Sequence, residues 1–191
     1  MATKLIKLRK GEREFPIDKL SDLENYDGLE VMGGSMEEFP DIIEETKHLK
    51  IFIANCPELK IFPNFILQLE NLERLKVKNS KIELIPEIQI KCTHLKTIDF
   101  NSNELKNLPL WIYSLKDLEE FSAAGNSIES ISEEISNMTS LKRINLDRNQ
   151  LKNIPKSMTK LTGLNHLSLE QNSFTEEVRN ELFLNYKIWF N

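Results

Sequence analysis

The chain has few of the residues on which many enzymes and secreted proteins depend. Its 191 residues include two cysteines, three histidines and six glycines. Two cysteines provide no disulfide framework. The sequence has no glycine-rich phosphate loop and no G-x-S-x-G, H-E-x-x-H or C-x-x-C motif. These absences argue against the common nucleotide-binding, hydrolase and zinc-protease chemistries, and we expect no enzyme, no cofactor and no metal.

An excess of basic charge and long apolar runs are also missing. The formal net charge is −5 at pH 7, whereas a nucleic-acid-binding domain usually has a basic excess. No apolar run approaches the roughly 18 residues of a membrane-spanning helix. Residues 1–10 are basic but lack the apolar stretch of a secretory signal. We therefore expect no nucleic-acid partner, no membrane span and a cytoplasmic location. Secretion or surface exposure would require a trimmed signal or a non-classical export route.

Apolar residues recur at a constant period along most of the chain. Steps of 23 connect Tyr26, Leu49, Leu72, Leu95, Leu118, Leu141 and Leu164. Further apolar residues follow each of these positions at fixed intervals of three, two and five residues. In most units an apolar residue and a proline come next, as in Leu108-Pro109. Each unit therefore follows the pattern L-x-x-L-x-L-x-x-N-x-L-x-x-L-P.

This pattern resembles the leucine-rich-repeat family, in its 23-residue class with Leu-Pro on the ascending side. The resemblance covers seven repeats over 26–174, after an N-terminal cap over 1–25. It implies an α/β fold, a right-handed, horseshoe-shaped solenoid with a parallel concave sheet and short helical or 3-10 segments on the convex side. The apolar-x-apolar pairs agree with this fold, because alternate side chains of a strand share one face. We expect a single domain whose repeats bury a core only by stacking.

The end of the chain predicts a C-terminal cap over 175–191. Thr175 is a suitable N-cap for a helix that has two acidic residues in its first turn. Residues 187–190 are typical of a short closing strand. A helix followed by a strand resembles the terminator of bacterial members of the family.

The last four repeats have an asparagine three residues after the strand pair, namely Asn103, Asn126, Asn149 and Asn172. In the family that the chain resembles, this side chain bonds the backbone of adjacent turns and forms a ladder. Irregular backbone over a core needs such partners. The first three repeats have other residues at this position, namely Gly34, Pro57 and Ser80. The ladder is therefore absent in the N-terminal half, or the register shifts there.

The second repeat allows two strand registers. In the strict register, Phe52 and Ala54 are the buried pair. In a register shifted by one residue, Ile51 and Ile53 are buried and Cys56 takes the ladder position. We favour the shifted register, because the strict one exposes two isoleucines and buries an alanine.

The side chains between the core positions of each strand are expected on the concave face. Arg74, Lys76 and Lys78 form a basic row there, beside the apolar residues of the second repeat. Five basic and five acidic residues nearly cancel over this face, which suits a specific protein surface better than a phosphate backbone. The candidate contact residues are Met32, Ile51, Phe52, Ile53, Arg74, Lys76, Lys78, Asp99, Asn101, Glu120, Arg143 and Asp147.

The sequence thus favours a non-enzymatic, monomeric interaction module that binds a protein or peptide partner on its concave sheet. Apolar residues beside a charged row have the composition of a binding hot spot. One alternative is a carbohydrate or small-ligand binder that uses the polar strip Asp99, Asn101, Glu120 and Asn145. Another is a secreted or surface-exposed adhesin or effector.

Overall fold

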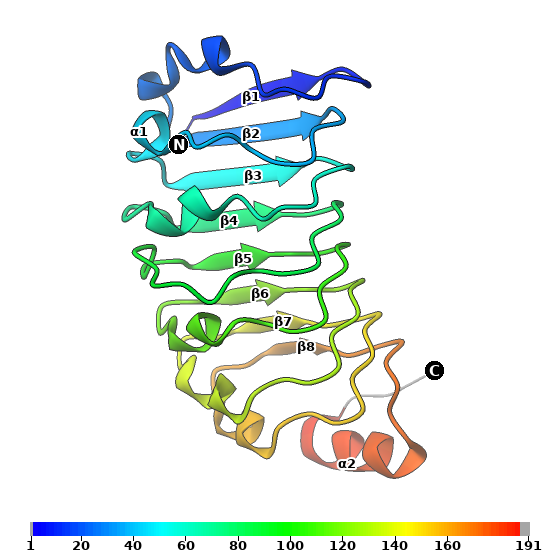
Figure 1. The fold of residues 1–191 in the computed structure, drawn as a ribbon. Coiled ribbons are helices and arrows are strands. Elements are labelled where there is room, and N and C mark those ends of the chain that lie inside the picture. The colour runs from blue at the N-terminus through cyan, green and yellow to red at the C-terminus, as the bar shows by residue number, and fades with distance from the viewer. Residues whose placement is uncertain (1, 188–191) are drawn as a thin grey trace.

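A computed structural model describes residues 2–187, apart from the side chains at 43 and 44. The described chain forms one parallel sheet, in which the strands lie side by side in chain order (Figure 1). The strands are β1 (Thr3–Leu8), β2 (Gly28–Gly33), β3 (Ile51–Asn55), β4 (Arg74–Val77), β5 (Thr97–Asp99), β6 (Glu120–Ser122), β7 (Arg143–Asn145) and β8 (His166–Ser168). The predicted solenoid with a parallel sheet and short helical turns is confirmed.

Strand pairing follows the period of the sequence. From β2 onward each residue pairs with the residue one repeat later, as Leu29 pairs with Phe52 and Phe52 with Leu75. The first pair differs, because Thr3 lies opposite Gly28, whereas the period would place it opposite Tyr26. The apolar side chains of successive repeats therefore stack into one continuous core.

Short helical segments cross the convex side. They are η1 (Ile17–Leu20), η2 (Leu23–Asn25), α1 (Ile43–Thr46), η3 (Asn64–Gln68), η4 (Leu110–Ser114), η5 (Glu133–Asn137) and η6 (Lys156–Lys160). A proline directly precedes η3, η4 and η6, with φ between −65° and −73°, because its ring holds φ near the helical value. Ser132 takes this place before η5 and accepts a hydrogen bond from Glu134 N at 3.2 Å. Serine thus replaces proline here as a side-chain cap.

The second repeat adopts the strict register, so the predicted shift is wrong. Phe52 and Ala54 are fully buried, and Phe52 packs edge-on against Phe65, with ring centroids 5.6 Å apart. A shift by one residue would move this ring out of the core. Ile51 is also mostly buried, but on the opposite face, where Gly28 leaves space for it. A Cβ at Gly28 would lie 2.9 Å from the Cβ of Ile51.

The turn after β3 differs from the turns of the other repeats. Elsewhere the residue before the ladder position has a positive φ, as in Ser102 (56°), Gly125 (67°) and Arg148 (53°). Cys56 holds the equivalent place in the second repeat; it is buried and donates its thiol to Val31 O at 3.7 Å. This carbonyl corresponds by repeat to those that the ladder asparagines bind. The cysteine therefore takes over one ladder contact without a shift of the strand.

The four asparagines form the ladder that the resemblance implies. Asn149 shows the pattern: Nδ2 donates to Ala123 O at 2.9 Å and to Leu146 O at 3.0 Å. Its Oδ1 accepts from Ile128 N at 3.0 Å. Asn103, Asn126 and Asn172 make the equivalent bonds. Each amide therefore ties its own turn to the turn before it.

Helix α2 (Glu176–Tyr186) covers the last repeat. Thr175 caps it by accepting a hydrogen bond from Val178 N, and Leu182 is buried against the core. The predicted helix is confirmed, whereas all but the first residue of the predicted closing strand lie outside the described residues. No helix within residues 2–187 is long and apolar enough to cross a membrane.

Candidate functional site

The pairing register arranges the concave side chains in columns that run across the strands. Because side chains alternate along a strand, residues that pair across the sheet project from the same face. One column contains Ile51, Arg74, Thr97, Glu120, Arg143 and His166. The next contains Leu5, Glu30, Ile53, Lys76, Asp99, Ser122, Asn145 and Ser168. Neighbours in a column are separated by the strand spacing of about 4.8 Å.

Apolar side chains gather on β1 to β3. We call Leu5, Met32 and Ile53 the apolar patch. Leu5 is 46% exposed, while Met32 and Ile53 are partly exposed. Ile51, also predicted as a contact residue, is 8% exposed and adds little surface to the patch. The sequence did not identify Leu5 as a contact residue, because the repeat period does not extend to β1. Phe52 leaves the candidate set, because its side chain is fully buried and cannot contact a partner.

The predicted basic row lies next to this patch on β4 and just beyond it. Lys76 Nζ lies 3.9 Å from Asp99 Oδ2 on β5, so part of its charge is balanced within the sheet. Arg74 and Lys78 have no carboxylate within ion-pair distance among the described residues. Two of the three cations are thus available to an external anion.

Asp99 and Asn101 hold the chain where it leaves β5. Asp99 Oδ1 accepts a hydrogen bond from Asn101 N at 3.1 Å. Asn101 Oδ1 accepts from Ser122 Oγ at 2.7 Å and from Ala124 N at 2.6 Å in the next repeat. Both side chains, predicted as contact residues, therefore also stabilise the turns.

The same arrangement recurs two repeats later. Asn145 Oδ1 accepts from Asp147 N at 3.0 Å. Asp147 Oδ1 accepts from Ser168 Oγ and from Glu170 N, each at 2.7 Å. The formal charges of this face nearly cancel in the sequence. In the structure, the carboxylates of Asp99 and Asp147 already accept hydrogen bonds from the sheet and its turns, so they are less available to a partner.

A shallow hollow of about 230 Å³ lies on the concave face between β4 and β8. Its polar rim includes the predicted residues Lys76, Asp99, Asn101, Glu120 and Arg143, together with His166. The structure does not place Asp147, Arg74, Lys78 or the apolar patch in this hollow. The candidate residues thus divide into two adjoining areas, an apolar and basic one on β1–β4 and a mixed polar one on β4–β8.

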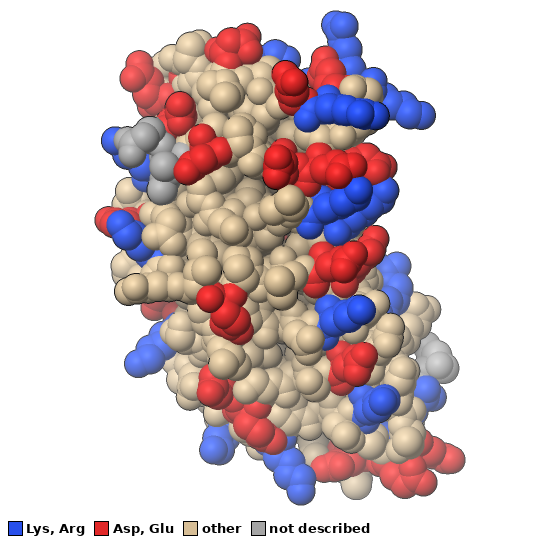
Figure 2. All heavy atoms as spheres, in the orientation of Figure 1, with Lys and Arg blue, Asp and Glu red and all other residues tan. Residues whose placement is uncertain are grey.

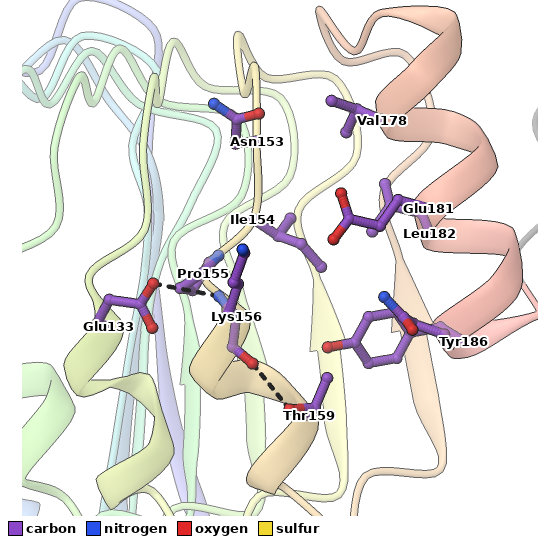
Figure 3. Close-up of a pocket in the computed structure, with 11 residues that line it drawn as sticks. Glu133, Asn153, Ile154, Pro155, Lys156, Thr159, Val178, Glu181, Leu182 and Tyr186 are labelled. Carbon is purple, nitrogen blue, oxygen red and sulfur yellow. Dashed lines mark hydrogen bonds between the residues drawn. The ribbon is translucent and has the colours of Figure 1, made fainter.

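A larger cavity of about 480 Å³ lies where α2 meets the last turns (Figure 3). Its walls include Ile154, Val178, Leu182 and Tyr186, and the sequence did not indicate it. The carboxylate of Glu133 accepts backbone hydrogen bonds from Lys156 and Ser157, so it is committed to joining two turns. The cavity therefore belongs to the junction between cap and solenoid, at the point where the chain continues beyond residue 187.

Cys56 and Cys92, the two cysteines of the chain, are both buried. No cluster of three His, Cys, Asp or Glu suited to a metal occurs among the described residues. Burial raises the pKa of both cysteine thiols, Cys56 and Cys92, to about 12, so they remain protonated at neutral pH. The concave face presents hydrogen-bonding groups, charged side chains and apolar side chains.

Comparison with known proteins agrees with this description. Residues 124–174 match the family model described as leucine rich repeat. The chain has the leucine-rich-repeat fold. A sequence comparison with curated proteins gave no match.

Three solved leucine-rich-repeat structures resemble the whole array. A protein of Leptospira interrogans is 23% identical, with a TM-score of 0.70 over 98% of this chain and 54% of its own. An internalin of Listeria monocytogenes is 18% identical, with a TM-score of 0.71 over 94% of this chain and 51% of its own. The ectodomain of a plant membrane receptor kinase from Arabidopsis thaliana, in complex with Casparian strip integrity factor 2, is 24% identical. Its TM-score is 0.72 over 90% of this chain and 21% of its own.

The chain thus spans about half the length of the first two structures and about a fifth of the third. At these identities the likeness shows the fold alone.

Proposed function

We propose that this leucine-rich-repeat chain binds a protein or peptide partner on its concave face and catalyses no reaction. The observation that carries the proposal is that the apolar patch on β1–β3 lies beside the next repeat, which carries the free cations Arg74 and Lys78. Leucine-rich-repeat folds commonly mediate protein–protein interaction, and one of the solved structures described above is a complex with a named factor.

The geometry favours an extended segment that has an apolar residue close to an acidic one. The cations lie one to three strand spacings from the side chains of the patch, about 5–15 Å. An extended chain covers this distance in two to five residues, at about 3.3 Å per residue. Burial of the apolar side chain would supply affinity, at about 25 cal/mol for each Å² removed from water. The carboxylate opposite Arg74 and Lys78 would set orientation and partner choice.

The test is affinity capture from native lysate, followed by mass spectrometry, with three forms of the protein in parallel. R74E/K78E reverses the free cations, and K116E/K160E makes the same change in charge at exposed positions away from the concave strands. We expect wild type and the control to capture one partner that R74E/K78E loses. I53S should weaken the same capture by removing part of the apolar patch. Equal capture by all forms would refute the assignment to the concave face.

A second candidate is a carbohydrate or small polar ligand in the hollow between β4 and β8. The observation that favours it is the convergence of Glu120, Arg143 and His166, of which Glu120 and Arg143 form no ion pair with a described residue. A glycan array tests it, with E120Q as the variant expected to lose the signal. The absence of any hit would leave the protein-binding proposal as the only one supported.

A further inference from the structure

Two rows of charged side chains run along the stack, and in both rows the sign alternates at every repeat. The first row immediately precedes the strands and contains Asp27, Lys50, Glu73, Lys96, Glu119 and Lys142. The second row lies ten residues later in each repeat and contains Glu37, Lys60, Glu83, Lys106, Glu129 and Lys152. The two rows are in phase, so the first, third and fifth repeats carry two acids and the second, fourth and sixth carry two bases.

The strand register brings the members of the first row side by side. Lys96 Nζ lies 2.8 Å from Glu73 Oε2, and Lys142 Nζ lies 2.8 Å from Glu119 Oε2. The hydrogen bond from Lys96 lowers the pKa of Glu73 below its ordinary value. Each of these acids therefore meets a base across a repeat boundary.

The second row follows the edge of the molecule toward which the strands point. Figure 2 shows red and blue alternating down this edge. Lys60 Nζ lies 3.0 Å from Glu37 Oε1 in the preceding repeat. A shorter row of Glu58, Lys81 and Glu104 runs beside it with the opposite phase, and Lys81 pairs with Glu58. Lys60 and Lys81 on this edge thus each pair with an acid of the preceding repeat.

The apolar core specifies only weakly which repeat stacks on which. Apolar side chains of differing size occupy the same positions in every repeat, so a repeat placed against the one two steps away would still meet apolar side chains. The charges can make this distinction, because their pattern recurs only in every second repeat. A skipped repeat would place like charges together in both rows at once, and like charges directly opposite each other are destabilising.

We propose that the two rows select the stacking order of the repeats, so that a pair of successive repeats, and not the single repeat, is the unit that specifies this solenoid. The rows act against alternative arrangements that the core alone would accept. The seventh repeat has uncharged residues, Asn165 and Thr175, at the two positions, and Thr175 is already the N-cap of α2. The alternation therefore ends where the cap begins and no further repeat has to be chosen.

The first experiment separates alternation from net charge in the full-length protein. In E73K/E119K the first row contains five consecutive lysines. In D27K/K50E/E73K/K96E/E119K/K142E every sign is inverted, so the row still alternates and the net charge is unchanged. E24K/E181K makes the same change in net charge as the first variant at exposed positions outside both rows.

We expect the thermal midpoint of E73K/E119K to fall by several degrees at low salt. It should recover in about 1 M salt, where the Debye length is about 3 Å. The inverted variant and E24K/E181K should stay close to wild type at both salt concentrations. An inverted variant as unstable as E73K/E119K, or a like-sign variant as stable as wild type at low salt, would overturn the proposal.

The second experiment removes whole repeats while keeping the repeat frame. Deleting 95–117 places Glu73 and Glu83 against Glu119 and Glu129. Deleting 95–140 removes more of the core but places the same two acids against Lys142 and Lys152. We expect the longer deletion to be the more stable at low salt and the shorter deletion to be the more stable at high salt, because the shorter one retains more core.

If the single-repeat deletion does not fold, substitutions that restore the alternating charge signs in both rows still test the proposal. Adding E119K/E129K/K142E/K152E to the deletion of 95–117 makes both rows alternate again with no change in net charge. We expect this compensated form to fold at low salt. If it behaves like the uncompensated deletion at every salt concentration, the charges do not select the stacking order.

Discussion

Replacement of Asn149 by alanine tests how much the asparagine ladder contributes to stability. The side chain is 6% exposed. Its Nδ2, which carries two hydrogens, donates to two backbone carbonyls at 2.9 and 3.0 Å and lies 3.2 Å from a third, and its Oδ1 accepts one backbone N–H at 3.0 Å. An internal hydrogen bond contributes about 1 kcal/mol net, so three bonds correspond to about 3 kcal/mol. Ile128 is fully buried, and its unpaired N–H would raise the loss toward about 5 kcal/mol.

Ser80 provides the matched control, because it occupies the same position in the third repeat. Its hydroxyl donates only to Lys78 O, at 3.1 Å, so we expect S80A to cost less than about 1 kcal/mol. Urea unfolding followed by far-ultraviolet circular dichroism measures both variants, provided that the slopes agree with wild type. A midpoint for N149A no lower than that for S80A would show that the ladder is not a main source of stability.

Two further predictions concern the second repeat and the thiols. F52A should lower the free energy of unfolding by about 3–5 kcal/mol, whereas I53A, on the half-exposed concave side, should cost less than about 1 kcal/mol in the same urea assay. Cys56 and Cys92 should resist a thiol reagent at about pH 8 until urea unfolds the chain, because burial raises their pKa to about 12. The free energy of unfolding should fall as pH rises from about 9 toward 12, because in this range the two thiols lose their protons only in the unfolded chain. Rapid labelling of the native protein, or a free energy of unfolding that does not change with pH, would contradict this account.

The period of the sequence predicts the strands because each repeat fixes the same apolar positions. The period also places Phe52 and Ala54 correctly in the core, and the predicted shift at Ile51-Phe52-Ile53 is wrong because every residue there is apolar and alternation carries no information. Two features support the strict register: Phe65 provides an aromatic contact for Phe52, and Gly28 leaves space for Ile51. Both contacts depend on the folded arrangement, and Gly28 belongs to the preceding repeat.

The alternation of side chains along each strand predicts which residues lie on the concave face, but it does not predict which hydrogen bonds they make. Asp99 and Asn145 each accept the N–H of the residue two positions later, a habit of Asx residues that the sequence could have suggested. The bonds from Asn101 to Ser122 and from Asp147 to Ser168 cross to the next repeat and depend on the stacked structure. Leu5 was missed because β1 pairs with β2 at an offset that differs from the repeat period.

Each strand of the array packs mainly against the strand before it and the strand after it. Such an array unfolds locally, and unfolding of a repeat at one end directly destabilises only the repeat next to it. A partner lying across β2 to β7 would contact several repeats at once and so connect repeats that do not contact one another. We expect its binding to slow amide hydrogen exchange throughout the bridged repeats, including in core strands that the partner does not reach. In this solenoid, the bound partner would make the bridged repeats unfold together as one cooperative unit.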